Sequence, residues 1–117
     1  MIFGIGIDIV EVKRFEESLA KTPELKTRLF VGEERNLKPR SLAARFAAKE
    51  ALMKAVGEAK GLSFQEVEIV NDKNGKPSFD ISKETKKTIE LKNISSLHLS
   101  LSHDGDYAIA YVIAECA

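Results

Sequence analysis

The fold is decided by the stretch Leu42-Ala-Ala-Arg-Phe-Ala-Ala-Lys-Glu-Ala-Leu-Met-Lys-Ala-Val56. Its apolar residues fall on nearly every side of a helix, which predicts a central, largely buried helix rather than a surface one. Ser41 offers an N-cap for this helix, and Gly57 offers a stop. The rest of the fold is expected to be arranged around it.

The few polar side chains of this helix fall on two lines. Arg45 and Lys49 share one line, and Glu50 and Lys54 share another. The commoner interpretation of the second line is an i,i+4 salt bridge. The alternative is a metal ligand, Glu50, beside a lysine that holds a phosphate. The two interpretations are compatible.

Strands are predicted at both ends of the chain. Residues 2–10 are β-branched and glycine-rich, which indicates a buried strand. Residues 97–103 alternate between apolar and polar, and Asp104-Gly105 turns the chain into a last strand over 107–115. Both faces of this last strand are apolar, so we expect both to be covered, one by a helix, with another subunit as the candidate for the other.

The remaining segments complete an α+β fold, with a small, mostly antiparallel sheet packed on the long central helix. Residues 1–117 are expected to form a single domain. The other predicted elements are a helix over 11–19, short helical turns over 24–38, a hairpin of 66–70 with 77–81, and a charged helix over 82–92.

Composition excludes several classes of function. The 18 basic and 18 acidic residues balance, so there is no basic excess for nucleic-acid binding. No stretch is long enough to span a bilayer, and Asp8 interrupts the one run that resembles a secretory leader. The only cysteine, Cys116, has no disulfide partner, which fits a reducing compartment. We therefore expect a cytoplasmic protein with no nucleic-acid or membrane partner.

Asp8 is the first candidate for chemistry. A carboxylate within a run of Ile and Val is costly to bury unless it is paired, hydrogen-bonded or bound to a metal. A structural ion pair with Arg14 or Arg45 is one interpretation. The other is a Mg²⁺ site with Glu50, since Mg²⁺ takes one or two carboxylates and completes its shell with water and phosphate.

Two further features are weaker. His103 stands at the end of a strand beside a tight turn, where a structural hydrogen-bonding role is the commoner one. The sequence Gly75-Lys76-Pro77 is, in isolation, a hairpin turn. Together with Asp8 and Glu50, these residues indicate no more than a site for a phosphate and a metal ion.

Four segments of the chain resemble signature segments of one family, in the same order. The chain is similar to the holo-acyl-carrier-protein synthases, the small stand-alone branch of the 4′-phosphopantetheinyl transferases. The two most specific segments are Gly6-Ile-Asp-Ile-Val-Glu-Val-Lys-Arg14 and Arg45-Phe-Ala-Ala-Lys-Glu-Ala-Leu-Met-Lys-Ala-Val-Gly57. The other two are Asn74-Gly-Lys-Pro77 and Leu99-Ser-Leu-Ser-His-Asp104.

The resemblance implies a Mg²⁺-dependent enzyme of fatty acid biosynthesis. Such an enzyme moves the phosphopantetheine group of coenzyme A onto a serine of apo-acyl carrier protein and releases 3′,5′-ADP. By this resemblance, Asp8 and Glu50 are metal ligands and, with Lys54, the catalytic residues. The positions that the resemblance assigns to coenzyme A are Arg45, Lys49, Lys54, Gly57, Lys76, Pro77 and His103.

The resemblance also implies partners. Arg14 matches a basic position that meets an acidic helix of the acyl carrier protein. The family forms homotrimers with active sites between subunits, which would place Asp8, Glu50 and Lys54 on one wall. Lys76-Pro77 and His103 would then form the other wall. The loop Gly57-Glu-Ala-Lys-Gly61 keeps the family's glycines only at its ends.

Two other functions stay open on the residues alone. One is a different metal-dependent phosphotransferase or phosphohydrolase that acts on a small nucleotide. The other is a non-catalytic module that binds acidic helices through Arg14. Such a module would not need Asp8 in its first strand, so the sequence favours an enzyme.

Overall fold

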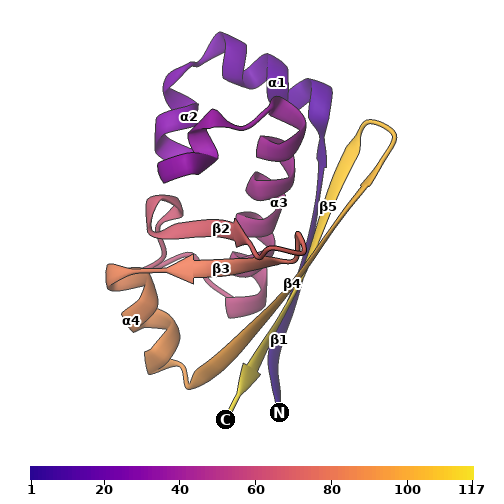
Figure 1. Cartoon of the computed structure of the whole chain (residues 1–117). Helices are drawn as coiled ribbons and strands as arrows, with labels where there is room; N and C mark the ends of the chain where they lie inside the picture. The colour runs from indigo at the N-terminus through magenta and orange to yellow at the C-terminus, as the bar shows by residue number, and fades with distance from the viewer.

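The computed structural model describes residues 1–117 and has two antiparallel sheets around one long helix (Figure 1). A strand at each end of the chain and the strand before the last form the larger sheet. The elements are β1 (Ile2–Glu11), α1 (Val12–Lys21), α2 (Glu24–Leu29), η1 (Gly32–Asn36), α3 (Pro39–Val56), η2 (Phe64–Glu66), β2 (Val67–Asn71), β3 (Pro77–Ile81), α4 (Lys83–Leu91), β4 (Ile94–Asp104) and β5 (Tyr107–Cys116).

The larger sheet has the order β1-β5-β4 and is antiparallel throughout. Helix α3 packs against one of its faces, where Ala108, Ala110 and Ala114 of β5 are completely buried. These small side chains let the helix lie close to the middle strand. The predicted α+β fold, an antiparallel sheet on a long central helix, is confirmed.

Helix α3 begins earlier than the sequence suggested. The N-cap is Lys38, and Pro39 occupies the first turn of the helix, so the expectation of Ser41 as N-cap is wrong. Proline suits the first turn because its fixed φ is helical and its missing N–H would have had no partner there. The predicted stop at Gly57 is confirmed, with a left-handed φ of 96° that glycine adopts without strain.

Two glycines of β1 bring the sheet into contact with the backbone of α3. A Cβ atom on Gly6 would lie 1.9 Å from the carbonyl oxygen of Ala51, and one on Gly4 would lie 2.1 Å from that of Ala55. Neither distance is possible for a real side chain, so only glycine permits this approach. Asp8 follows on the same face of the strand, one pleat beyond Gly6.

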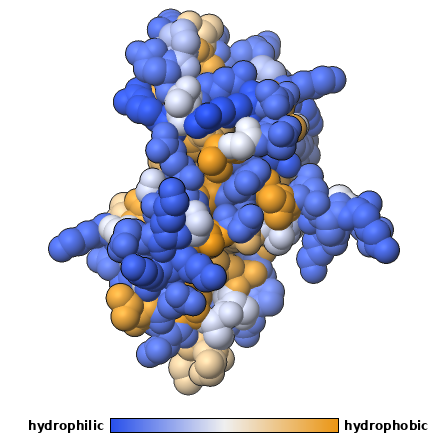
Figure 2. Space-filling model, turned by 60° about the vertical axis from the view of Figure 1, so that its left-hand side comes forward, coloured by the Kyte–Doolittle hydropathy of each residue, from blue (hydrophilic) through white to orange (hydrophobic).

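The other face of the larger sheet is open, apolar over β1 and β5 and polar over β4. The prediction that residues 2–10 form a buried strand is therefore wrong for the single chain. Ile5, Ile7 and Ile9 of β1 are each more than half exposed, and Tyr111 of β5 is 40% exposed. In contrast, hydrophobic residues form only small areas between hydrophilic ones on the side shown in Figure 2. A row of exposed isoleucines is unusual for a protein surface and marks an interaction site. No helix of the chain is long and apolar enough to cross a membrane.

Candidate active site

A cavity of about 560 Å³ lies between the end of β1 and the helices α1, α2 and α3. Three acidic residues, Asp8, Glu11 and Glu50, line it together with Arg14. The other lining residues are Ile9, Val10, Phe15, Ser18, Leu25, Leu29, Phe46 and Phe64. The cavity therefore combines acidic groups and one basic group with a largely apolar wall.

Lys54 is the partner of Asp8. Its ammonium lies 3.2 Å from Oδ1 of Asp8 and donates a hydrogen bond of 2.9 Å to the carbonyl oxygen of Ile7. Asp8 therefore forms its ion pair with Lys54, and not with Arg14 or Arg45 as the structural alternatives would have it. The side chain of Lys54 is 55% exposed, so the pair itself contributes little stability and leaves the ammonium accessible.

Glu50 lies close enough to Asp8 for the two charges to interact. Burial raises the pKa of the Glu50 carboxyl above its usual value, and the charge of Asp8 raises it further, while Lys54 opposes both. The Asp8 side chain is only 17% exposed. A bound divalent cation would offset this repulsion.

This pair of carboxylates suits Mg²⁺ by its chemistry. Mg²⁺ is bound in proteins by one or two carboxylates, with water and substrate phosphates as its other ligands. No group of three or more His, Cys, Asp or Glu side chains that could hold a metal is present in the chain. A complete all-protein metal cage is therefore absent, and the donor set fits a metal that shares its shell with a phosphorylated substrate.

Arg45 points away from this cavity, about 140° around α3 from Glu50. Its Nε atom is buried without a hydrogen-bond partner, and burial lowers the pKa of the guanidinium, an effect that the charge of Glu34 opposes. A buried donor without a partner is uncommon and needs an explanation. An acceptor oxygen of a ligand would satisfy it.

Lys49 does not have the position that the resemblance suggested. It is completely buried, and its ammonium donates to the carboxylate of Glu34 and to two backbone carbonyl groups. Burial lowers the pKa of Lys49, while its hydrogen bond to Glu34 raises it. The expectation that Lys49 adds charge around the nucleotide is wrong for this structure, because no part of the side chain is accessible to a ligand.

The predicted residues of the second wall lie outside this cavity. His103 is on β4, separated from β1 by β5, and its Nε2 atom is 3.2 Å from the carbonyl oxygen of Arg40. Lys76 and Pro77 lie at the β2–β3 hairpin. Gly57, which the resemblance assigned to coenzyme A but to neither wall, lies at the end of α3. None of these four lines the cavity of Asp8 and Glu50. Within one chain, only Asp8, Glu50, Lys54 and Arg14 come together.

The family of the chain is clear from comparison with known proteins. A family model described as the 4′-phosphopantetheinyl transferase superfamily matches residues 4–112, so the chain belongs to this superfamily. Two of its similar relatives are named holo-[acyl-carrier-protein] synthase. The protein of Clavibacter sepedonicus is 49% identical over 98% of this chain and 97% of its own length. That of Renibacterium salmoninarum is 50% identical over 98% of this chain and 99% of its own.

Solved structures give the same result. The chain superposes on holo-[acyl-carrier-protein] synthase from Neisseria meningitidis with a TM-score of 0.92 and 40% identity, covering 98% of this chain and 99% of that one. The synthase from Bacillus anthracis, solved in complex with CoA (3′,5′-ADP), gives a TM-score of 0.82 and 39% identity over 100% of this chain and 99% of that one. The resemblance found in the sequence is confirmed along the whole chain.

Proposed function

We propose that this protein transfers the 4′-phosphopantetheine group of coenzyme A to a serine of apo-acyl carrier protein, releasing 3′,5′-ADP, with Asp8 and Glu50 as ligands of Mg²⁺. The observation that carries this proposal is the convergence of these two carboxylates in one cavity, in a chain of the 4′-phosphopantetheinyl transferase superfamily. Relatives solved with coenzyme A support the choice of co-substrate.

Each group of the cavity has a role in this reaction. Mg²⁺, when bound, supplies electrostatic stabilisation of the phosphoryl oxygens. Asp8 and Glu50 would hold it, and Lys54 presents an accessible ammonium to the negative charge that builds on the phosphates. The serine hydroxyl must lose a proton, and a carboxylate of the cavity such as Glu50 is a candidate acceptor.

We assign the second wall of the active site to a neighbouring subunit of a homotrimer. His103, Lys76 and Pro77 lie outside the cavity of their own chain, so they would reach coenzyme A from an adjacent copy. Arg45, partly buried on the other side of α3 from Glu50, would join this wall. The exposed isoleucines of β1 offer the surface for such an assembly.

A charge on the open sheet face is expected to break the assembly. Ile5→Glu places a carboxylate among the exposed isoleucines without touching the cavity. Burying that charge at an interface is costly, so we expect a monomer that no longer transfers phosphopantetheine. Light scattering gives the mass and an assay the turnover. Leu91→Glu, at an exposed leucine that ends α4, is the matched control; a variant Ile5→Glu that stays trimeric would contradict the assignment.

Arg14 is proposed to meet an acidic helix of the carrier protein. It is exposed at the start of α1 and lines the cavity of Asp8 and Glu50. Arg14→Glu reverses the charge there, so we expect KM for the carrier protein to rise by about tenfold or more, with KM for coenzyme A unchanged. Steady-state kinetics at low and high salt test this, because the difference between variant and wild type should shrink as salt screens the charges.

One experiment tests the function itself. The protein is incubated with apo-acyl carrier protein, coenzyme A and Mg²⁺, and the mass of the carrier is measured. The proposed activity adds one phosphopantetheine group to the carrier. Hydrolysis of coenzyme A with an unchanged carrier would indicate a phosphohydrolase, and binding without either reaction would indicate a non-catalytic module; both outcomes would overturn the proposal.

We also propose that the reaction takes place in the cytoplasm, within fatty acid biosynthesis and in a single domain of residues 1–117. The lone, unpaired Cys116 supports the location, because proteins of oxidising compartments commonly pair their cysteines. Acyl carrier protein, named as the substrate in the relatives' names, supports the pathway.

A further inference from the structure

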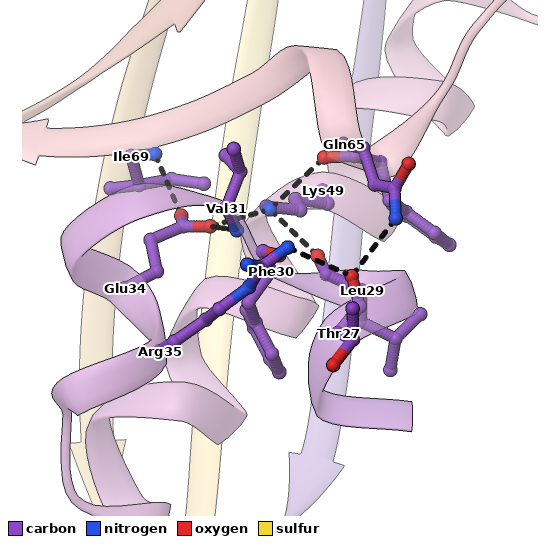
Figure 3. A network of polar contacts seen from close by, with 10 residues as sticks. Thr27, Leu29, Phe30, Val31, Glu34, Arg35, Lys49, Gln65 and Ile69 are labelled. Carbon is purple, nitrogen blue, oxygen red and sulfur yellow. Dashed lines mark hydrogen bonds and ion pairs between the residues drawn. The ribbon is translucent and has the colours of Figure 1, made fainter. Parts of the chain in front are cut away.

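Lys49 is the centre of a buried network that the proposed reaction does not use (Figure 3). Its ammonium donates to the carboxylate of Glu34 at 2.7 Å, to the carbonyl oxygen of Leu29 at 2.8 Å and to that of Phe64 at 3.2 Å. It also lies 5.2 Å from the centre of the Phe30 ring. All three protons of the ammonium are thus used by groups from three separate segments of the chain.

Both carboxylate oxygens of Glu34 also accept hydrogen bonds. Its Oε1 atom accepts from Lys49 and from the backbone N–H of Val31 at 3.0 Å, and its Oε2 atom accepts from the backbone N–H of Ile69 at 2.9 Å. The side chains of Lys49 and Glu34 are 0% and 1% exposed. The pair therefore joins α3 to the end of α2, to η1, to η2 and to the start of the β2–β3 hairpin.

Apart from this pair, the only fully buried side chain that ties the segment of α2 and η1 to the core is Phe30. Helix α2 has six residues and buries none of them, and η1 buries only Glu34. Yet Leu25 and Leu29 of this segment, together with Phe64, form the apolar wall of the cavity that contains Glu50. Two of these three wall residues, Leu29 and Phe64, supply the carbonyl groups that Lys49 binds.

Lys49 also immediately precedes Glu50 in α3. Adjacent residues of a helix point about 100° apart, so one turn of α3 directs a carboxylate into the cavity and an ammonium into the supports of its wall. A buried ion pair is weak evidence for stability, because the desolvation of both charges offsets their attraction. Five directional bonds to four segments are instead a means of fixing positions.

We propose that the Lys49–Glu34 pair positions the apolar wall of Leu25, Leu29 and Phe64 for docking of the carrier protein. The inference rests on the proposed function, because Arg14, the residue assigned to the carrier, lines the same cavity. Lys49 and Glu34 touch neither substrate, so both are positioning residues. With the wall preformed, docking does not have to order it.

The test is the double variant Lys49→Met with Glu34→Gln, which removes both charges together and leaves neither one buried alone. We expect KM for the carrier protein to rise by about tenfold, the cost of ordering a few side chains on docking. The turnover number kcat and KM for coenzyme A should stay within about threefold of wild type, because neither residue touches a substrate. A variation of about threefold is small compared with the tenfold effect expected for the carrier protein. Amide hydrogen exchange should accelerate at Val31 and Ile69, whose N–H groups lose a carboxylate acceptor.

The matched control is Ile94→Ala. Ile94 is 6% exposed in the core at the start of β4 and does not line the cavity. This variant should lower Tm through a core cavity and leave KM for the carrier unchanged. A purely structural pair would behave in the same way, so a lower Tm with unchanged carrier KM in the double variant would overturn the proposal. A fall in kcat alone would also overturn it.

Glu34→Gln alone keeps the proposal testable if the double variant does not fold. A glutamine has one acceptor oxygen, so its NH₂ group must face either Lys49 and Val31 or the N–H of Ile69. The same rise in carrier KM is expected, and its absence would overturn the proposal. Failure of the wild-type protein to load any carrier would be a different result, which overturns the proposed function; hydrogen exchange at Val31 and Ile69 would still report whether the pair holds the wall.

Discussion

Asp8→Asn and Glu50→Gln are each expected to reduce phosphopantetheine transfer by roughly 10³-fold, the scale expected when a group that stabilises transition-state charge is lost. Both replacements keep the size of the side chain and remove its negative charge. Each removes one of the two carboxylates assigned to the metal, so affinity for Mg²⁺ should fall as well. Transfer is measured as the mass of the carrier, and metal affinity by calorimetry.

The fold should survive both replacements, which separates a metal site from a structural ion pair. The raised pKa of Glu50 means that its charged form is disfavoured in the metal-free protein. Glu50→Gln removes that unfavourable charge, so the metal-free variant should be at least as stable as wild type. Asp8→Asn loses only the ion pair with Lys54, whose side chain is 55% exposed, so the effect on stability should be small. Large destabilisation of either variant would point to a structural pair.

Glu84→Gln provides the matched control for these two variants. Glu84 is exposed in α4 and makes only a 3.5 Å surface pair with Lys87, so its neutralisation should change neither transfer nor Mg²⁺ affinity. Turnover retained by Asp8→Asn or Glu50→Gln when Mg²⁺ is added would contradict the assignment of the metal ligands.

The sequence was a good guide to the fold because hydrophobic periodicity is a local signal. The alternation over residues 97–103 predicts a strand with one covered face, and its leucines are partly buried while its serines are exposed. The apolar surface all around the helix of 42–56 predicts a buried helix, which the structure confirms. The start of α3 was placed wrongly, because Ser41 and Pro39 are both helix-start signals and the proline acts two residues earlier. Boundaries depend on such competition between neighbouring residues.

The sequence was a poorer guide to the direction of charged side chains. Lys49 and Glu50 are adjacent in one signature segment, yet the first is sealed in the core and the second lines the cavity. The partner of Lys49 is Glu34, fifteen residues away, and no local pattern links the two. Asp8 similarly pairs with Lys54, across 46 positions. Such pairs depend on tertiary packing, which periodicity does not report.

Gly6→Ala is expected to have the second large effect, through the geometry of the site rather than its chemistry. The new Cβ atom would lie 1.9 Å from the carbonyl oxygen of Ala51 and 2.8 Å from the backbone nitrogen of Ala55. Both are helix backbone atoms that cannot rotate away, so β1 must move from α3 by on the order of 1 Å. Asp8, one pleat further along β1, would then move away from Glu50.

Two consequences follow for this variant. Overpacking should cost about 1–3 kcal/mol of stability, which a denaturant titration measures. A displacement of about 1 Å at a catalytic group should reduce transfer by roughly 10²-fold in the folded protein, measured at a temperature well below Tm. Mg²⁺ affinity should fall with it, because the two carboxylates no longer converge.

Gly4→Ala separates these two consequences. A Cβ atom on Gly4 would lie 2.1 Å from the carbonyl oxygen of Ala55, so its clash, and hence its cost in stability, should be similar to that at Gly6. Gly4 is two pleats from Asp8 and close to the β1 terminus, where the strand is free to yield before the site is disturbed. We expect Gly6→Ala to lose more transfer activity than Gly4→Ala, because glycine at position 6 holds Asp8 close to Glu50. Equal losses in the two variants would contradict this, since general destabilisation would then limit activity.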